Sequence, residues 1–372
     1  MPPFGSVTTE AAYEVLWWRT AFGEEEIRAV TEAIRGEHVS QGPVTAQFEA
    51  QLADALEVPY AVATTSGSMA LLMALMALGI KPGDEVIVPN RTFIATAHAA
   101  MLLGAKVVLV DARPDLPTMD VSQLEREVTA RTRAIMPVHL NGRAVDMTAV
   151  NQVAKEYGLL VVEDAAQALF SRNADGFLGT QSDAGCFSLG VTKLISTGQG
   201  GFVVTRSRET YERLLLIRNH GVADTMDAEY TRMGFNFKFN DLLASVGLAQ
   251  LSRVPRRIAH IKAIYARYAA AIADLPFLNL IPVNLEAGGI PLWVECLCQE
   301  REPVMAFLNS RRIQTRKFLP DLHLSPHLQN FGEFPRSKVF CERGFSLPGG
   351  PEQPLEHIDR VLEALRNFGE SA

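Results

Sequence analysis

Between residues 60 and 164 the chain alternates short apolar segments with segments of helical spacing. We predict strands at 60–65, 85–88, 106–110, 134–138 and 159–162, separated by helices near 67–78, 94–103, 122–128 and 147–157. The strands are rich in Val and Ile and show no period of two, which indicates burial on both faces. This alternation predicts an α/β fold of three layers, in which helices cover both faces of a mostly parallel sheet.

The alternation becomes less regular after Asp164. We expect strands at 186–189 and 202–205, and helices near 210–218, 241–251 and 257–273. From about residue 276 the chain has a further strand at 292–297 and helices at 303–311 and 355–367. We therefore predict a large domain over residues 1–255, with residues 1–22 as a covering segment, and a smaller α+β domain over residues 256–372.

Composition and charge argue against several classes of protein. A chain of 372 residues that is 48% hydrophobic is large enough to form a substantial core. Its net charge of −7 argues against a nucleic-acid or anionic-membrane partner, because neutralising phosphates needs clustered Lys and Arg. The longest apolar stretch, residues 69–80, is too short to span a bilayer, and the N-terminus lacks the pattern of a signal peptide. We therefore expect a cytoplasmic protein without a membrane partner.

Cysteine and histidine spacing predicts neither a disulfide framework nor a metal site. Four cysteines are too few to hold together so long a chain, and their spacing does not match a zinc site. Cys296 and Cys298 lie two residues apart in an apolar run, so we expect both to be buried, reduced thiols on one face of a strand. His139, His220 and His323 lie far apart without further ligand-type neighbours. Each is therefore interpreted first as a structural histidine.

A first candidate site lies at the turn Ser66-Gly67-Ser68. The turn joins the predicted strand 60–65 to the helix that follows, and ligands of open α/β sheets bind at the carboxyl ends of strands. Backbone N–H groups at a helix N-terminus bind anions, and a glycine lets a phosphate approach closely. The alternative is that Ser66 only caps the helix.

Asp164 and Lys193 are two further candidates. Asp164 follows a buried strand, and burying a carboxylate is costly unless it has a donor or a cation beside it; the alternative is a helix cap. Glu163 is expected on the opposite face of that strand. Lys193, one of eight lysines, lies in a loop rich in Gly, Ser and Thr. Desolvation there favours the neutral amine that Schiff-base chemistry needs, and the alternative is a solvent-facing or phosphate-binding lysine.

A phosphate-binding turn, an acidic residue and a neutral lysine, in that order, are the parts of a pyridoxal-phosphate site. At these residues the chain resembles the DegT/DnrJ/StrS family of sugar aminotransferases, which are pyridoxal-phosphate enzymes of fold-type I. The resemblance extends from about residue 24 to the C-terminus. Its motifs include TSGSMAL (65–71), PGDEVIVP (82–89), PVHLNG (137–142), VEDAAQA (162–168) and FLPDLH (318–323).

The resemblance implies roles for residues around the cofactor ring. Lys193 would carry pyridoxal 5′-phosphate as a Schiff base and would move the proton during catalysis. Asp164 would pair with the ring nitrogen, Gln167 would hydrogen-bond the ring hydroxyl and Phe93 would stack on the ring. The retained Lys193 favours transamination, because a dehydratase branch of the family has His at this position.

The resemblance also implies a phosphate site, a subunit interface and a substrate pocket. Asn236 would reach the phosphate from the other subunit of a homodimer, and His323 and His139 would line the substrate pocket. The residues that would hold the phosphate within one chain are Ser66, Gly67, Ser68 and Ser188.

The implied activity is the transfer of an amino group from Glu or Gln to a keto sugar, expected to be nucleotide-activated. Three alternatives remain on the same fold: a pyridoxal-phosphate-dependent keto-sugar dehydratase, a cyclitol (inosose) aminotransferase and a non-catalytic regulatory homologue. Lys238, Leu194 and His98 depart from the residues usual in the family, so the identity of the sugar is left open.

Overall fold

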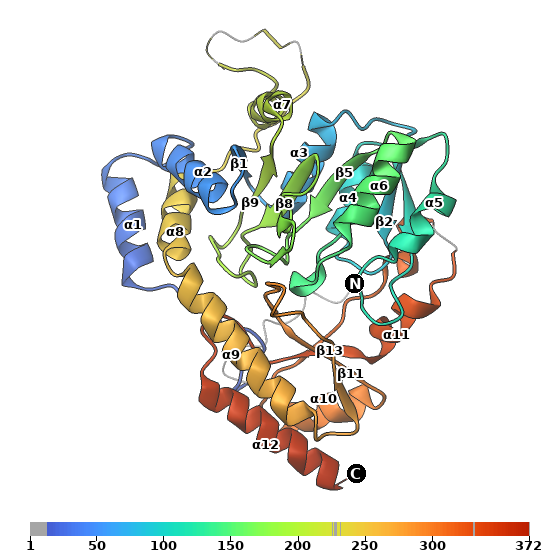
Figure 1. The fold of residues 1–372 in the computed structure, drawn as a ribbon. Coiled ribbons are helices and arrows are strands. Elements are labelled where there is room, and N and C mark those ends of the chain that lie inside the picture. Colours follow the sequence, from blue (N-terminus) through green and yellow to red (C-terminus); the bar gives the residue numbers. More distant parts are fainter. Residues whose placement is uncertain (1–12, 225, 227–228, 231, 330–331, 372) are drawn as a thin grey trace, which may run out of the picture.

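The computed structural model describes residues 13–224, 226, 229–230, 232–329 and 332–371. Within these residues the chain forms a seven-stranded sheet between helices and a smaller four-stranded sheet built from later residues (Figure 1). The predicted α/β fold with a mostly parallel sheet is therefore confirmed.

The large sheet has the strand order β1-β9-β8-β5-β4-β2-β3. Its strands are β1 (Tyr60–Thr64), β2 (Glu85–Pro89), β3 (Lys106–Val110), β4 (Thr132–Ile135), β5 (Leu160–Asp164), β8 (Ala184–Ser188) and β9 (Gly201–Thr205). All of them run in one direction except β9, which is antiparallel to both of its neighbours. The carboxyl ends of β1, β2, β5 and β8 therefore meet at one edge of the sheet.

Helices pack on both faces of this sheet. Its flanking helices include α3 (Gly67–Ala77), α4 (Ala95–Leu102), α6 (Met147–Tyr157) and α7 (Arg208–Arg218). In β2, Val86 and Val88 join the core formed with α3 and α4, whereas Ile87 joins the core formed with α6. Burial on both faces thus explains why the strands lack an apolar–polar alternation.

Short elements complete this part of the chain. The predicted helix near 122–128 is a 3₁₀ turn, η2 (Val121–Gln123), followed by the single-turn helix α5 (Leu124–Glu127). A two-stranded hairpin, β6 (Arg172–Asn173) and β7 (Gly176–Phe177), follows β5.

Three helices gather beside β1 at the edge of the sheet (Figure 1). They are α1 (Glu24–Arg35), α2 (Pro43–Ala55) and α8 (Asp241–Leu251). The buried carboxylate of Asp241 accepts hydrogen bonds from the N–H groups of Gly42, Val44 and Thr45 and from the hydroxyl of Thr45. Asp241 thereby satisfies N–H groups that the first turn of α2 leaves without partners inside that helix.

The long helix α9 (Val254–Ile272) leads from α8 to the smaller sheet (Figure 1). The strand order of this antiparallel sheet is β10 (Leu278–Leu280), β11 (Val294–Cys298), β13 (Gly344–Leu347) and β12 (Arg316–Lys317). The accompanying elements are α10 (Arg301–Ser310), η4 (Leu322–Leu324), η5 (Pro326–Leu328), α11 (Pro335–Arg343) and α12 (Leu355–Ser371). Cys296 and Cys298 are free, buried thiols on one face of β11, as predicted. β10, β12 and β13 were not predicted from the sequence, because they are too short to show a period of their own.

The described part of the covering segment, residues 13–22, contacts both halves of the chain. Val15 pairs with Ile313 and packs in the core of the smaller sheet, while the indole N–H of Trp18 donates to the carbonyl of Val191. Residues 1–12 of this predicted segment lie outside the described residues. The proposed division at residue 255 falls at the start of α9, between the segments that build the two sheets.

Candidate active site

A cavity of about 390 Å³ lies at the carboxyl ends of β1, β2, β5 and β8 and is closed by residues of the smaller sheet. This volume lies in the range of small-molecule sites. Eight of the eleven residues predicted for the site line this cavity. They are Ser66, Gly67, Ser68, Phe93, Asp164, Gln167, Ser188 and Lys193.

The turn before α3 forms a cradle at one end of the cavity. Ser66 caps the helix, because its hydroxyl accepts a hydrogen bond of 3.2 Å from the N–H of Met69. The first N–H groups of a helix have no partner within it, which leaves those of Gly67 and Ser68 available. A Cβ on Gly67 would lie 2.8 Å from the Cβ of Ser188, so only glycine allows this close approach. Ser66 therefore caps the helix, and the free N–H groups beside it also suit an anion.

The carboxylate of Asp164 is buried at the end of β5 and has two donors. The hydroxyl of Thr96 donates to it at 2.8 Å and the N–H of Ala166 at 3.1 Å. Burial raises the pKa of Asp164, while these hydrogen bonds and the positive charge of Lys193 oppose the increase. Glu163 does not line the cavity, as the alternation along the strand predicted. One carboxylate of the pair is therefore available to a ligand.

Lys193 lies in the loop between β8 and β9 with its ammonium facing Trp293. Its Nζ atom is 5.3 Å from the centre of the Trp293 ring. Burial lowers the pKa of Lys193 from 10.5 to about 8, the charge of Asp164 raises it, and Arg316 lowers it further. A substantial fraction of the amine is therefore neutral near neutral pH, as attack on a carbonyl requires.

We expect the amine of Lys193 to become reactive at lower pH than an ordinary lysine. With a pKa of about 8, roughly a tenth of it is neutral at pH 7, and the fraction rises to one half at about pH 8. Labelling of the protein without cofactor by an amine-selective reagent, followed by mass spectrometry across pH, should show this midpoint. Exposed Lys81 provides the reference, and equal pH profiles for both residues would contradict the prediction.

The smaller sheet supplies a polar and aromatic wall that the sequence analysis did not identify. Trp293 and Glu295 lie on one face of the chain at β11 and both line the cavity. Asn141 holds both, since its Nδ2 donates to the carbonyl of Trp293 at 2.8 Å and to Glu295 at 2.9 Å. The period of two that placed Cys296 and Cys298 together also places Trp293 and Glu295 together on the other face.

Two arginines add positive charge to the same cavity. Arg316 lies over the ring of Trp17, at 4.7 Å from its centre. Arg91 follows β2 and pairs with the buried carboxylate of Asp321 at 3.0 Å. Both arginines line the cavity, although neither was singled out in the sequence.

Three of the predicted site residues do not line the cavity. The His139 ring is fully buried and lies 2.8 Å from the carboxylate of Glu163, and its predicted contact with substrate stays a prediction. The backbone N–H of His323 donates to the side chain of Asn90 at 2.9 Å, and the predicted contact of His323 with substrate stays a prediction. Asn236 is exposed, and its predicted contact with a partner subunit stays a prediction.

The described part of the chain contains no cluster of three or more His, Cys, Asp or Glu side chains arranged to hold a metal ion. It also contains no helix whose length and apolar character would allow it to cross a membrane.

Comparison with known proteins gives one consistent result. The model of the DegT/DnrJ/EryC1/StrS aminotransferase family matches residues 20–366. The chain is 36% identical to the dTDP-3-amino-3,4,6-trideoxy-alpha-D-glucose transaminase of Streptomyces venezuelae, over 93% of this chain and 94% of that protein. It is 34% identical to the GDP-perosamine synthase of Caulobacter vibrioides, over 88% and 90% of the two chains.

A solved structure shows the same likeness in three dimensions. The crystal structure of DesV from S. venezuelae matches with a TM-score of 0.89 and 34% sequence identity, covering 93% of this chain and 94% of that chain. The family match extends over nearly the whole chain and includes every residue that lines the cavity except Trp17. The protein therefore belongs to the DegT/DnrJ/EryC1/StrS aminotransferase family, as the resemblance in its sequence predicted.

Proposed function

We propose that this aminotransferase uses pyridoxal 5′-phosphate to move an amino group from Glu or Gln to a nucleotide-activated keto sugar in amino-sugar biosynthesis. The observation that carries the proposal is the amine of Lys193, whose pKa is lowered to about 8 inside the cavity that Asp164 also lines. A lysine in this state suits covalent chemistry with an aldehyde better than solvent exposure or structural pairing.

The residues of the cavity fit this cofactor. The helix N-terminus at Gly67 and Ser68, with Ser188 packed against it, would hold the phosphate. Asp164 would accept a hydrogen bond from the ring nitrogen, and the half-exposed Phe93 would cover the ring. Bound there, the cofactor supplies an electron sink for the negative charge that develops at the substrate carbon.

Each of the other side chains in the cavity would have its own role in binding or proton transfer. Lys193, in its neutral form, would act as general base and remove a proton from the amino donor. It would then act as general acid and return the proton. Asp164 would keep the ring nitrogen protonated by its negative charge. Gln167 would bind the ring hydroxyl; its Oε1 already accepts the N–H of Asn141 at 3.1 Å, which leaves its NH₂ group to donate. Arg91 and Arg316 would attract the anionic groups of the substrates.

A direct assay tests this function. The protein is incubated with pyridoxal 5′-phosphate, Glu and a panel of keto sugars linked to dTDP or GDP, the two carriers named in its relatives. Formation of 2-oxoglutarate together with an amino sugar supports the proposal. A dehydratase would consume the keto sugar without forming an amino sugar, and an inosose aminotransferase would accept only cyclitols. A regulatory homologue would turn over none of these compounds.

We also propose that the protein works as a cytoplasmic homodimer, in which Asn236 reaches the cofactor phosphate of the partner subunit's site. Asn236 is exposed and does not line the cavity of its own chain, which agrees with a role outside that cavity.

We expect Asn236→Ala to lose cofactor during gel filtration while the dimer persists. The substitution removes one neutral donor to a phosphate, so the dissociation constant should rise about tenfold, equivalent to roughly 1.5 kcal/mol. Equilibrium dialysis measures the constant and sedimentation measures the mass. Exposed Asp224 provides a control as Asp224→Ala. Cofactor retention equal to that of the unmodified protein would remove Asn236 from the proposed site.

A further inference from the structure

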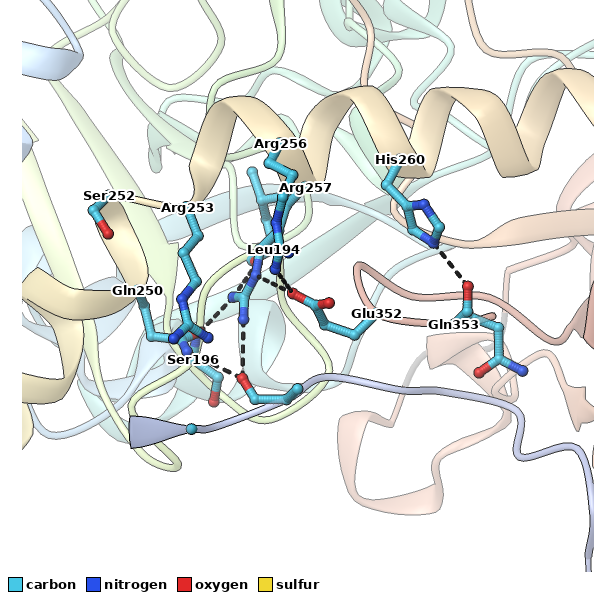
Figure 2. Close-up of polar contacts among 12 residues, drawn as sticks. Leu194, Ser196, Gln250, Ser252, Arg253, Arg256, Arg257, His260, Glu352 and Gln353 are labelled. Atoms are coloured by element: carbon cyan, nitrogen blue, oxygen red, sulfur yellow. Dashed lines mark hydrogen bonds and ion pairs between the residues drawn. The ribbon is translucent and has the colours of Figure 1, made fainter. Parts of the chain in front are cut away.

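The loop that carries Lys193 is held from outside the cavity by a buried arginine. Figure 2 shows the polar contacts of Arg257, which lies on α9. Its side chain is fully buried, and Arg257 does not line the cavity. Burying a guanidinium is costly unless its N–H groups find acceptors, so its partners show which segments it holds together.

Arg257 donates to acceptors from four different segments. Nη1 donates to the carbonyl of Leu194 at 3.1 Å and also to the side-chain oxygen of Gln250. Nη2 donates to the carbonyl of Ala21 at 3.0 Å, and Nε lies 3.4 Å from the carboxylate of Glu352. Leu194 follows Lys193 directly in the chain. The guanidinium therefore fixes the backbone one residue away from the reactive amine.

Gln250 provides a second connection to the same loop. Its side-chain oxygen accepts the N–H of Ser196 at 3.3 Å, and its amide nitrogen donates to Glu26 at 2.7 Å. Gln250 is fully buried at the end of α8, next to the start of α9. The loop is thus held at residues 194 and 196 from the junction of two helices.

Between β8 and β9 the loop contains one bridge, between Gly190 and Gly198, but no helix or strand, so contacts from outside the loop contribute to its position. Gly198 and Gly200 have positive φ angles, so its own backbone preferences do not restrict it to one conformation. A guanidinium suits the task, since its planar fork reaches several acceptors at once, whereas an ammonium is a point charge.

We propose that Arg257 is a positioning residue that sets the place of the Lys193 amine in the cavity by holding the carbonyl of Leu194. The proposal rests on the proposed function of Lys193. Displacing a reacting group by about 1 Å costs about 100-fold in rate, so an arginine outside the cavity has a large effect on turnover.

The test compares Arg257→Met with Arg256→Met, the same change at the next position of α9. Arg256 is mostly exposed, and of the partners of Arg257 it contacts only Glu352. Replacing Arg256 therefore leaves the hydrogen bonds from Arg257 to the loop intact. In Arg257→Met we expect kcat to fall about 10- to 100-fold, with little change in the KM for the amino donor. Arg256→Met should keep the kcat of the unmodified enzyme.

A second measurement separates positioning from a general loss of stability. Release of the loop lets water reach the amine, so the labelling midpoint of Lys193 in cofactor-free Arg257→Met should rise from about pH 8 toward 10.5. Thermal unfolding is recorded for the same samples. A lower unfolding temperature with kcat and labelling midpoint unchanged would overturn the proposal.

A milder variant covers the case in which Arg257→Met does not fold. Arg257→Lys keeps the positive charge, but its ammonium cannot bond to Leu194, Gln250 and Ala21 together. We expect a smaller decrease in kcat and a smaller rise of the labelling midpoint than in Arg257→Met. Normal kcat and midpoint in Arg257→Lys would then contradict the proposal. If borohydride fails to trap the cofactor on Lys193 in the unmodified enzyme, the proposed function is wrong. If the cofactor is trapped but the Arg257 variants keep normal kcat and a normal labelling midpoint, only the positioning role is wrong.

Discussion

Replacing Lys193 with Ala should abolish amino transfer, with a loss of at least about 10³-fold in kcat. Lys193 is one of two lysines that line the cavity, and the other, Lys317, pairs with Glu302 at 2.6 Å. Proton transfer by a positioned side chain alone contributes about 10²- to 10⁴-fold. The covalent attachment of the cofactor is lost as well. Formation of 2-oxoglutarate from Glu measures the rate.

Lys193→Arg is the matched variant for this prediction. It keeps a long, positively charged side chain, but a guanidinium stays protonated and offers no neutral amine. We expect Lys193→Arg to be as inactive as Lys193→Ala. A control substitution, Lys317→Arg, changes a lysine at the edge of the same cavity and should retain turnover. Activity of Lys193→Ala within tenfold of the unmodified enzyme would exclude Lys193 as the reacting amine.

Replacing Asp164 with Asn should lower kcat by about 10²- to 10³-fold, the range found when one electrostatic group of an active site is removed. Asn keeps the shape of the side chain but loses the negative charge that would hold the ring nitrogen protonated. In Asp164 the N–H of Ala166 donates to one carboxylate oxygen and the hydroxyl of Thr96 donates to the other. The single amide oxygen of Asn can keep the hydrogen bond from Ala166, while its NH₂ group can donate to the Thr96 hydroxyl. The fold should therefore survive, and circular dichroism checks this.

The same variant has a second expected effect that does not need the cofactor. The charge of Asp164 raises the pKa of Lys193, so its removal should move the labelling midpoint of Lys193 below about pH 8. The sign follows because the ammonium form loses its attraction to a carboxylate and the neutral amine becomes favoured. An unchanged midpoint would show that the two groups do not interact.

Glu163→Gln provides the control for Asp164→Asn. Glu163 lies next to Asp164 in β5 but accepts hydrogen bonds from Gly179 and Gln181 on the other face of the strand. Its neutralisation should lower stability without the large loss of turnover. Equal losses of kcat in both variants would mean that the charge of Asp164 has no special role.

The main features of the large sheet were predictable because they are local. Apolar runs such as 85–88 are buried in β2, and strand alternation correctly separated Asp164 from Glu163. The reversed direction of β9 was not predictable, since a buried strand has the same composition in either direction. The helix near 122–128 was predicted too long, because residues 121–123 form a 3₁₀ turn.

The candidate site was predictable only where its residues follow strands of the large sheet. Ser66, Asp164 and Ser188 come at strand ends, which meet at one edge of a parallel sheet. Arg316 lies in a strand of two residues, and nothing in its neighbourhood points to a cavity formed mainly by residues before 201. The pairing of His139 with Glu163 was not predictable, because the two residues are 24 positions apart in sequence.

By itself, the sequence determined the α/β class, the family and the central residues Asp164 and Lys193. Hydrophobic periodicity indicates which segments are buried, and local motifs indicate where the strands end. Only the tertiary structure decided that Trp293, Glu295 and Arg316 close the cavity and that Arg257 holds the loop of Lys193. Arg257 and Leu194 are 63 residues apart in sequence, and Trp293 is 152 residues from Asn141, which holds it. Such pairings depend on how whole elements pack, and a single chain carries no local pattern that specifies them.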